Sequence, residues 1–241
     1  MHPTERAAQE ILASIEATFQ PTHRFVRVQA SGYRHLDLQF YERSARDLTA
    51  RGFTLLADVE DRTITETPGT VLSAIMVRTM ASRDGTVMCA LYHPHIRTFA
   101  LRALLWLLRK LPGKVTDMET ECTDGSFVVT TNAVSAAAFD SPPLIVTEYV
   151  PMKTAPLDVY ARHTQRVAEH LAGRPGVQAR SITSHDEMIA SQNRMNALKA
   201  AYRGEVGGVT RAELERLSTF GKGLAGDVHA AVVQEQMRRA V

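Results

Sequence analysis

Residues 115–132, VTDMETECTDGSFVVTTN, decide the fold that we expect. Asp124-Gly125 divides this stretch into two β-rich halves, and Asp-Gly suits a two-residue type I′ turn, because both central residues of that turn need positive φ. Residues 71–92 have the same form around Asp84-Gly85. The sequence therefore predicts two β-hairpins, each folded at an Asp-Gly turn.

A mainly apolar segment, residues 96–111, lies between the two hairpins and ends at Pro112-Gly113. Apolar side chains nearly encircle this predicted helix, so we expect it, with Trp106, to be buried against the hairpins. The arginines in and around the apolar stretch 99–108 leave contact with a membrane interface as an alternative.

Other patterns extend this sheet and cover it. Apolar residues at helical spacing, with Pro21, Gly52 and Gly173 as end signals, and short β-rich runs mark these elements. We predict helices over 4–19, 36–51 and 156–171, and strands over 24–29, 53–59, 144–149 and 177–182. The fold class is therefore α+β, with one largely antiparallel sheet covered by helices.

The C-terminal part of the chain is expected to be helical. Ser184 with Glu187, and Thr210 with Glu213, both fit the capping box that begins a helix. We accordingly divide the chain into an α+β core domain, 1–182, and a helical extension, 183–241. The first helix of the extension carries a seam at alternating three- and four-residue steps, which either packs on its own domain or contacts a symmetry mate or another protein. This seam consists of Met188, Ser191, Met195, Leu198 and Tyr202.

Composition limits the classes of protein to consider. The 241 residues are 44% hydrophobic and carry a net charge of +2, which excludes bulk disorder, and they contain no basic run of the kind that binds nucleic acid. Cys89 and Cys122 form neither a disulfide framework nor a zinc pattern. Residues 1–20 do not resemble a signal peptide, and no apolar run is long enough to span a bilayer. We expect a soluble, cytoplasmic protein without membrane contact.

The strongest candidate site is an acidic face on the second hairpin. A two-residue turn opposes Glu121 to Val128, Glu119 to Thr130 and Asp117 to Asn132, which places these three carboxylates, the hydroxyl and the amide on one face. Oxygen ligands of this kind suit Mg²⁺ or Ca²⁺, or acid–base chemistry. The simpler interpretation, which we favour, is a solvated face of a half-buried sheet.

Other chemical motifs are weak. His93 and His95 are close enough in sequence to share a metal, whereas His163 and His170 are two turns apart on one predicted helix, and ordinary surface or capping roles are favoured for all four. The chain has no nucleophile elbow, phosphate-binding loop or dinucleotide fingerprint. We therefore predict no metal and no cofactor.

Two hypotheses of function follow. The first is a non-catalytic binding or regulatory protein that assembles with itself, as a homodimer, or recruits a protein partner through its C-terminal helices. The alternative is a small enzyme or ligand-binding protein that uses Asp117, Glu119, Glu121, Thr130 and Asn132, with or without a divalent cation.

Overall fold

The computed structural model describes residues 3–67, 73–98, 113–133, 139–217 and 222–239. Within these ranges the chain forms one seven-stranded sheet whose strands follow the order of the sequence. All neighbouring strands are antiparallel except β6 and β7, which are parallel. The strands are β1 (Phe25–Arg27), β2 (Thr54–Asp61), β3 (Val77–Ala81), β4 (Met88–Tyr92), β5 (Val115–Glu121), β6 (Phe127–Thr131) and β7 (Ile145–Tyr149). The predicted α+β class is confirmed.

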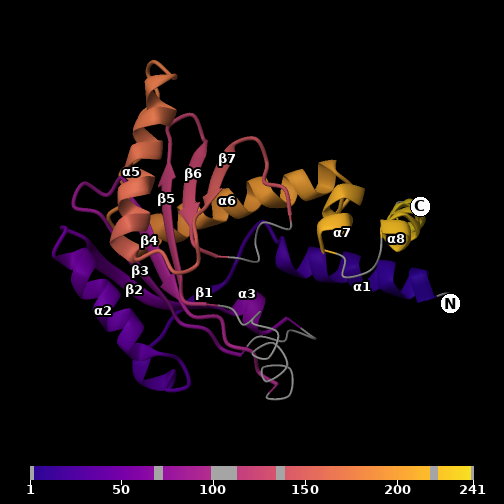
Figure 1. Cartoon of the computed structure of the whole chain (residues 1–241), viewed down its shortest axis with the longest axis horizontal. Coiled ribbons are helices and arrows are strands. Elements are labelled where there is room, and N and C mark those ends of the chain that lie inside the picture. The colour runs from indigo at the N-terminus through magenta and orange to yellow at the C-terminus, as the bar shows by residue number, and fades with distance from the viewer. Residues whose placement is uncertain (1–2, 68–72, 99–112, 134–138, 218–221, 240–241) are drawn as a thin grey trace.

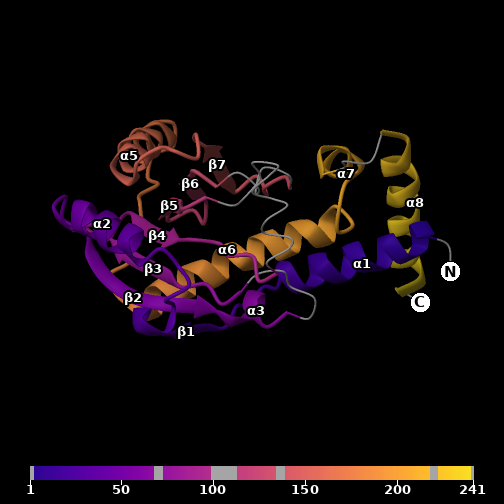
Figure 2. The same cartoon turned by 60° about the horizontal axis from the view of Figure 1, so that its bottom comes forward.

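Helices cover both faces of this sheet, as Figure 2 shows. Helices α2 (Leu38–Thr49) and α5 (Pro156–Ala172) pack on one face around a core that includes Tyr41, Leu91 and Met118. Helix α6 (His185–Glu205) crosses the other face, where its Met188 and Met195 are buried. The sheet is therefore the middle layer of three, and side chains on alternate positions of each strand face different helices.

Local sequence signals account for the ends of these helices. Asp37 caps α2 by accepting a hydrogen bond from the Phe40 amide, and Pro156 occupies the first turn of α5. The predicted capping box is present at the start of α6, where the side chains of Ser184 and Glu187 each accept from the other residue's backbone.

The remaining helices lie mainly at one end of the molecule, where both chain termini are found (Figure 1). Helix α1 (Pro3–Thr18) packs with α7 (Arg211–Leu217) and α8 (Lys222–Arg239) around a small core of its own. This core includes Leu12, Ile15, Leu214 and Val232. Two short helices, η1 (Ala30–Gly32) and α3 (Arg62–Thr65), flank β1 and β2.

Two predicted elements need comment. The expected strand over 177–182 is instead an extended segment that makes one isolated bridge, Cys122 to Ala179. Its backbone bonds to Glu121 at the end of β5 and to Thr123 and Gly85 in the connections between strands, so it does not run along a neighbouring strand. The predicted helix over 96–111 falls largely on residues 99–112, including Trp106, which lie outside the described residues. No helix in the described ranges combines the length and the apolar content that a membrane span requires.

Candidate functional site

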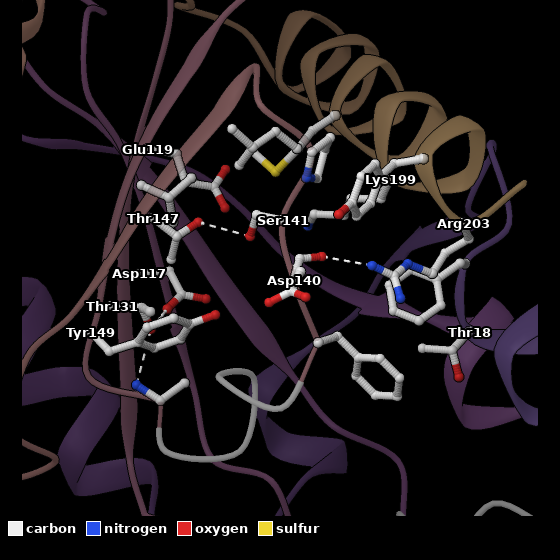
Figure 3. Close-up of a pocket in the computed structure, with 18 of the residues that line it drawn as sticks. Thr18, Asp117, Glu119, Thr131, Asp140, Ser141, Thr147, Tyr149, Lys199 and Arg203 are labelled. Carbon is white, nitrogen blue, oxygen red and sulfur yellow. Dashed lines mark hydrogen bonds between the residues drawn. The ribbon is translucent and has the colours of Figure 1, made fainter. Parts of the chain in front are cut away.

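A cavity of about 330 Å³ lies between the sheet and α6 (Figure 3). Its floor comes from β5, β6 and β7, its roof from α6, and one side from residues 139–142. Apolar side chains such as Val129, Ile145 and Met195 form much of the wall. Two carboxylates, Asp117 and Glu119, enter it from the sheet, because they stand two residues apart on β5 and so share a face.

Asp117 is held by hydroxyl groups. The Tyr92 hydroxyl donates to Oδ2 of Asp117 at 2.9 Å, and the Thr131 hydroxyl donates to Oδ1. Burial raises the pKa of Asp117, and these two hydrogen bonds oppose that rise only in part. The carboxylate is therefore fixed in position by neutral donors, and its charge is not cancelled by them.

Glu119 is the more perturbed of the two. Burial first, and repulsion from Asp117 second, raise its pKa to about 7. The Gln192 amide on α6 donates to Oε2 of Glu119 and favours the charged form, but too weakly to restore the ordinary value. Near neutral pH this group exchanges its proton readily, a property typical of binding and catalytic sites.

Lys199 enters the cavity from α6, across from the two carboxylates (Figure 3). Its positive charge lowers the pKa of both Asp117 and Glu119, although less than burial raises them. Among the residues that the structure describes, its ammonium group forms no ion pair and acts on the carboxylates only through its charge. The cavity thus has an acidic wall and one basic side chain that is not neutralised by close contact.

Arg203 lies at one end of the cavity and is paired with Glu213 behind it. Arg203 is 4% exposed and donates through one nitrogen to both carboxylate oxygens of Glu213, at 2.8 and 2.9 Å. Arg203 also donates to the Asp140 carbonyl at 2.8 Å, and the Asp140 amide donates to Glu213 at 2.7 Å. This buried ion pair holds residues 139–142 against α6 and α7 and so defines the rim of the cavity.

Glu121, the third carboxylate of the predicted acidic face, has a different environment. Arg194 donates to its two oxygens at 2.8 and 2.7 Å, and Arg180 lies 3.3 Å away. Although burial alone would raise the pKa of Glu121, the hydrogen bonds and charge of Arg194 hold it below its ordinary value. Glu121 is therefore an ion-pair residue between β5 and α6 and does not line the cavity.

The predicted places of Thr130 and Asn132 on the acidic face are wrong by one residue of register. Glu119 faces Val129 and Asp117 faces Thr131, because three residues, Thr123 to Gly125, connect the strands where two were expected. A shift of one residue moves every side chain of a strand to the other face. Thr131 therefore takes the position beside Asp117.

Thr130 and Asn132 have structural partners instead. Thr130 contacts Nδ1 of His163 at 3.0 Å and accepts from Arg166 at 2.9 Å, on the face covered by α5. Asn132 accepts from the Thr116 amide at 2.8 Å and donates to the Met152 carbonyl at 3.2 Å. Neither side chain reaches the cavity.

The seam predicted on the first C-terminal helix faces the chain's own sheet. Met188, Ser191 and Met195 are 3%, 0% and 1% exposed, so they are not available to a partner while α6 is docked. Leu198 and Tyr202 are half-buried, and Tyr202 lines the cavity. This outcome matches the intramolecular alternative for the seam.

The histidines do not form a metal site in the described part of the chain. His163 is fully buried between the hydroxyls of Thr120 and Thr130, and burial lowers its pKa to about 3. The rings of His35 and His95 are 5.2 Å apart, and His95 contacts the Ser73 hydroxyl. Among the described residues no three His, Cys, Asp or Glu side chains gather as ligands of one ion.

Comparison of the chain with protein-family models, with curated protein sequences and with solved structures gives no match.

Proposed function

We propose that this chain is a small-molecule-binding protein whose ligand carries a positively charged group that pairs with Asp117 and Glu119. The observation that carries the proposal is the position of both carboxylates in the wall of a largely apolar cavity, where their hydrogen-bond partners among the described residues are neutral side chains. The cavity volume of about 330 Å³ lies within the range of known ligand pockets.

The electrostatics of the cavity favour a cation over an anion. Both carboxylates have raised pKa values because burial penalises their charge, and an ammonium group beside them would relieve that penalty. Arg203 does not supply this charge, since it is paired with Glu213. Lys199 acts on both carboxylates only through its charge, which lowers their pKa values less than burial raises them.

The alternative that includes a divalent cation has less support. Glu121 is committed to Arg194, and Thr130 and Asn132 face elsewhere, so only two of the five predicted residues line the cavity. Ca²⁺ takes six to eight oxygen ligands, and Mg²⁺ fills an octahedral shell largely with water, so the two carboxylates in a mainly apolar wall supply only part of either ligand set. An organic ammonium group needs fewer protein contacts and fits the apolar walls better.

A titration with n-propylammonium chloride, followed by NMR at pH 8, tests this proposal. We expect saturable binding that the double variant Asp117→Asn/Glu119→Gln weakens about tenfold or more, because it removes the charge-assisted contacts. Asp47→Asn, an exposed carboxylate change on α2, is the matched control and should bind like the wild type. Sodium propionate, of similar size and opposite charge, should bind much more weakly.

The pH dependence gives a second readout from the same titration. An ammonium ligand prefers the ionised form of Glu119, so its affinity should rise as the pH increases through about 7. Binding that is equal for propylammonium and propionate, or that the double variant leaves intact, would contradict the proposal.

Capture of a protein partner by the C-terminal helices is a separate proposal, now restricted to α8. Met237 on this helix is 65% exposed, unlike the buried seam of α6. If α8 mediates assembly, Met237→Lys should lower the mass measured by light scattering or abolish recovery of the partner. If the mass and the partner recovery of Met237→Lys equal those of the wild type, assembly through this part of α8 is rejected.

A further inference from the structure

A second, smaller cavity adjoins the first. Its volume is about 60 Å³, and it lies under the first turns of α6, over β2, β3 and β4. Its walls are mainly apolar and include Val59, Val77, Met88 and Met188. Glu119 borders both cavities, so the two share this side chain as a wall.

The contact between Gln192 and Glu119 separates the two spaces. Gln192 borders the smaller cavity and not the larger one, and its amide donates to the Glu119 carboxylate. Gln192 is a half-buried side chain with several rotatable bonds, so it can move without disturbing the backbone of α6. A shift of these two side chains would join the cavities.

We infer that the smaller cavity is an apolar subsite for the tail of the ligand, and that Gln192 and Glu119 form the gate to it. This inference rests on the proposed function, because the cationic head of the same ligand occupies the larger cavity. A space of about 60 Å³ holds roughly two methylene groups, since a water molecule takes about 30 Å³. The ligand class is therefore an organic ammonium compound whose aliphatic tail beyond the gate is about two methylene groups long.

The methionines of the two cavities allow the head and the tail to be observed separately. Met195 lines the larger cavity, Met88 and Met188 line the smaller one, and the exposed Met237 serves as a reference. Methyl-labelled methionine NMR of the full chain is recorded during titration with methylammonium and with n-butylammonium. We expect both compounds to shift Met195, and only butylammonium to shift Met88 and Met188.

Affinity gives an independent measure of tail burial. Each methylene group that enters the smaller cavity should tighten binding about fourfold. Gln192→Ala opens the gate but also removes a hydrogen bond that favours ionised Glu119, so both amines lose some head-group affinity. The ratio of butylammonium affinity to methylammonium affinity should therefore rise in this variant. Ala90→Val fills the smaller cavity and should remove the responses of Met88 and Met188 to butylammonium, with the exposed Ala50→Val as its control.

The outcomes separate this inference from the proposed function. In the wild type, butylammonium could shift Met195 without shifting Met88 and Met188. This result would overturn the subsite and leave the proposed function unaffected. No shift at Met195 with either amine would contradict the proposed function, and the subsite would fall with it. The wild-type measurement decides both points even if Ala90→Val does not fold.

Discussion

Replacement of Glu119 by glutamine should make the protein more stable at alkaline pH. In the unfolded chain Glu119 ionises near its ordinary pKa of 4.5, whereas in the folded chain burial and Asp117 raise the pKa to about 7. The unfolded state therefore loses its proton first as the pH rises. The stabilising contribution of protonated Glu119 is complete below about pH 4.5 and is lost as the pH rises through about 7.

The size of this effect follows from the two pKa values. A difference of one pKa unit is worth about 1.4 kcal/mol, so the rise from 4.5 to about 7 corresponds to about 3 kcal/mol. Because Glu119 is half-buried, residual screening by solvent reduces this to about 2 kcal/mol. Glutamine keeps the shape of the Glu119 side chain and an oxygen that accepts from Gln192, but it cannot ionise. Glu119→Gln should therefore remove the loss of folding stability that the wild type shows as the pH rises.

Urea unfolding followed by circular dichroism between pH 4 and pH 8 measures the effect. We expect the variant and the wild type to have similar free energies of unfolding at pH 4, and the variant to be about 2 kcal/mol more stable at pH 8. Asp47→Asn on α2 should reproduce the wild-type curve. A variant with the wild-type pH dependence, or one destabilised at pH 8, would refute the placement of Glu119 in a desolvated cavity.

Further predictions concern the parts of the fold that frame the site. Gly85→Ala should destabilise the protein by more than about 2 kcal/mol, because Gly85 has a φ of +73° and a Cβ there would lie 2.5 Å from Oγ of Ser181 and 2.9 Å from backbone atoms. Gly125 has a φ of +82° but open space around it, so Gly125→Ala should cost only about 1 to 2 kcal/mol. The comparison of their thermal midpoints checks this difference, and equal losses would contradict it. Glu213→Ala should lower the free energy of unfolding in urea by about 3 to 5 kcal/mol, because it leaves the charge of Arg203 buried and unpaired. Glu66 belongs to an exposed ion pair, so Glu66→Ala should lower the free energy of unfolding by less than about 1 kcal/mol. A loss at Glu213 as small as the loss at Glu66 would show that the rim of the cavity is solvated.

The sequence predicted the elements of the fold well where the signals are local. The capping box of Ser184 and Glu187, the helix start at Pro156 and the positive φ of Gly52 all appear in the structure. Each depends on a few neighbouring residues whose backbone groups need a particular partner or conformation. The α+β class followed because the patterns alternate between helical and strand periods.

The candidate site was predicted only in part, because it depends on register and on contacts between distant segments. Asp117 and Glu119 share a face in any register, so their grouping could be read from spacing alone. Thr131 was missed because the length of the connection at Gly125 shifts β6 by one residue. Lys199 carries no local signal that places it opposite β5, since only the docking of α6 brings it there.

Burial was the other property that the sequence did not provide. A strand with alternating acidic residues is typical of a solvated sheet face, and this is the interpretation that the sequence alone favours. In the structure α6 covers this face, and its seam of Met188 and Met195 supplies the apolar contact. The same carboxylates that water would solvate on an open sheet therefore acquire raised pKa values in a cavity.

The central claim, that the cavity carboxylates bind a cationic ligand, is tested most directly by the ¹³C carboxyl titration of Glu119 with and without n-propylammonium. We predict that Glu119 titrates near pH 7 in the free protein and at a clearly lower pH when the amine is saturating, because a bound positive charge favours the ionised carboxylate. A titration near the ordinary value of 4.5, or one that saturating amine leaves unchanged, would contradict the account.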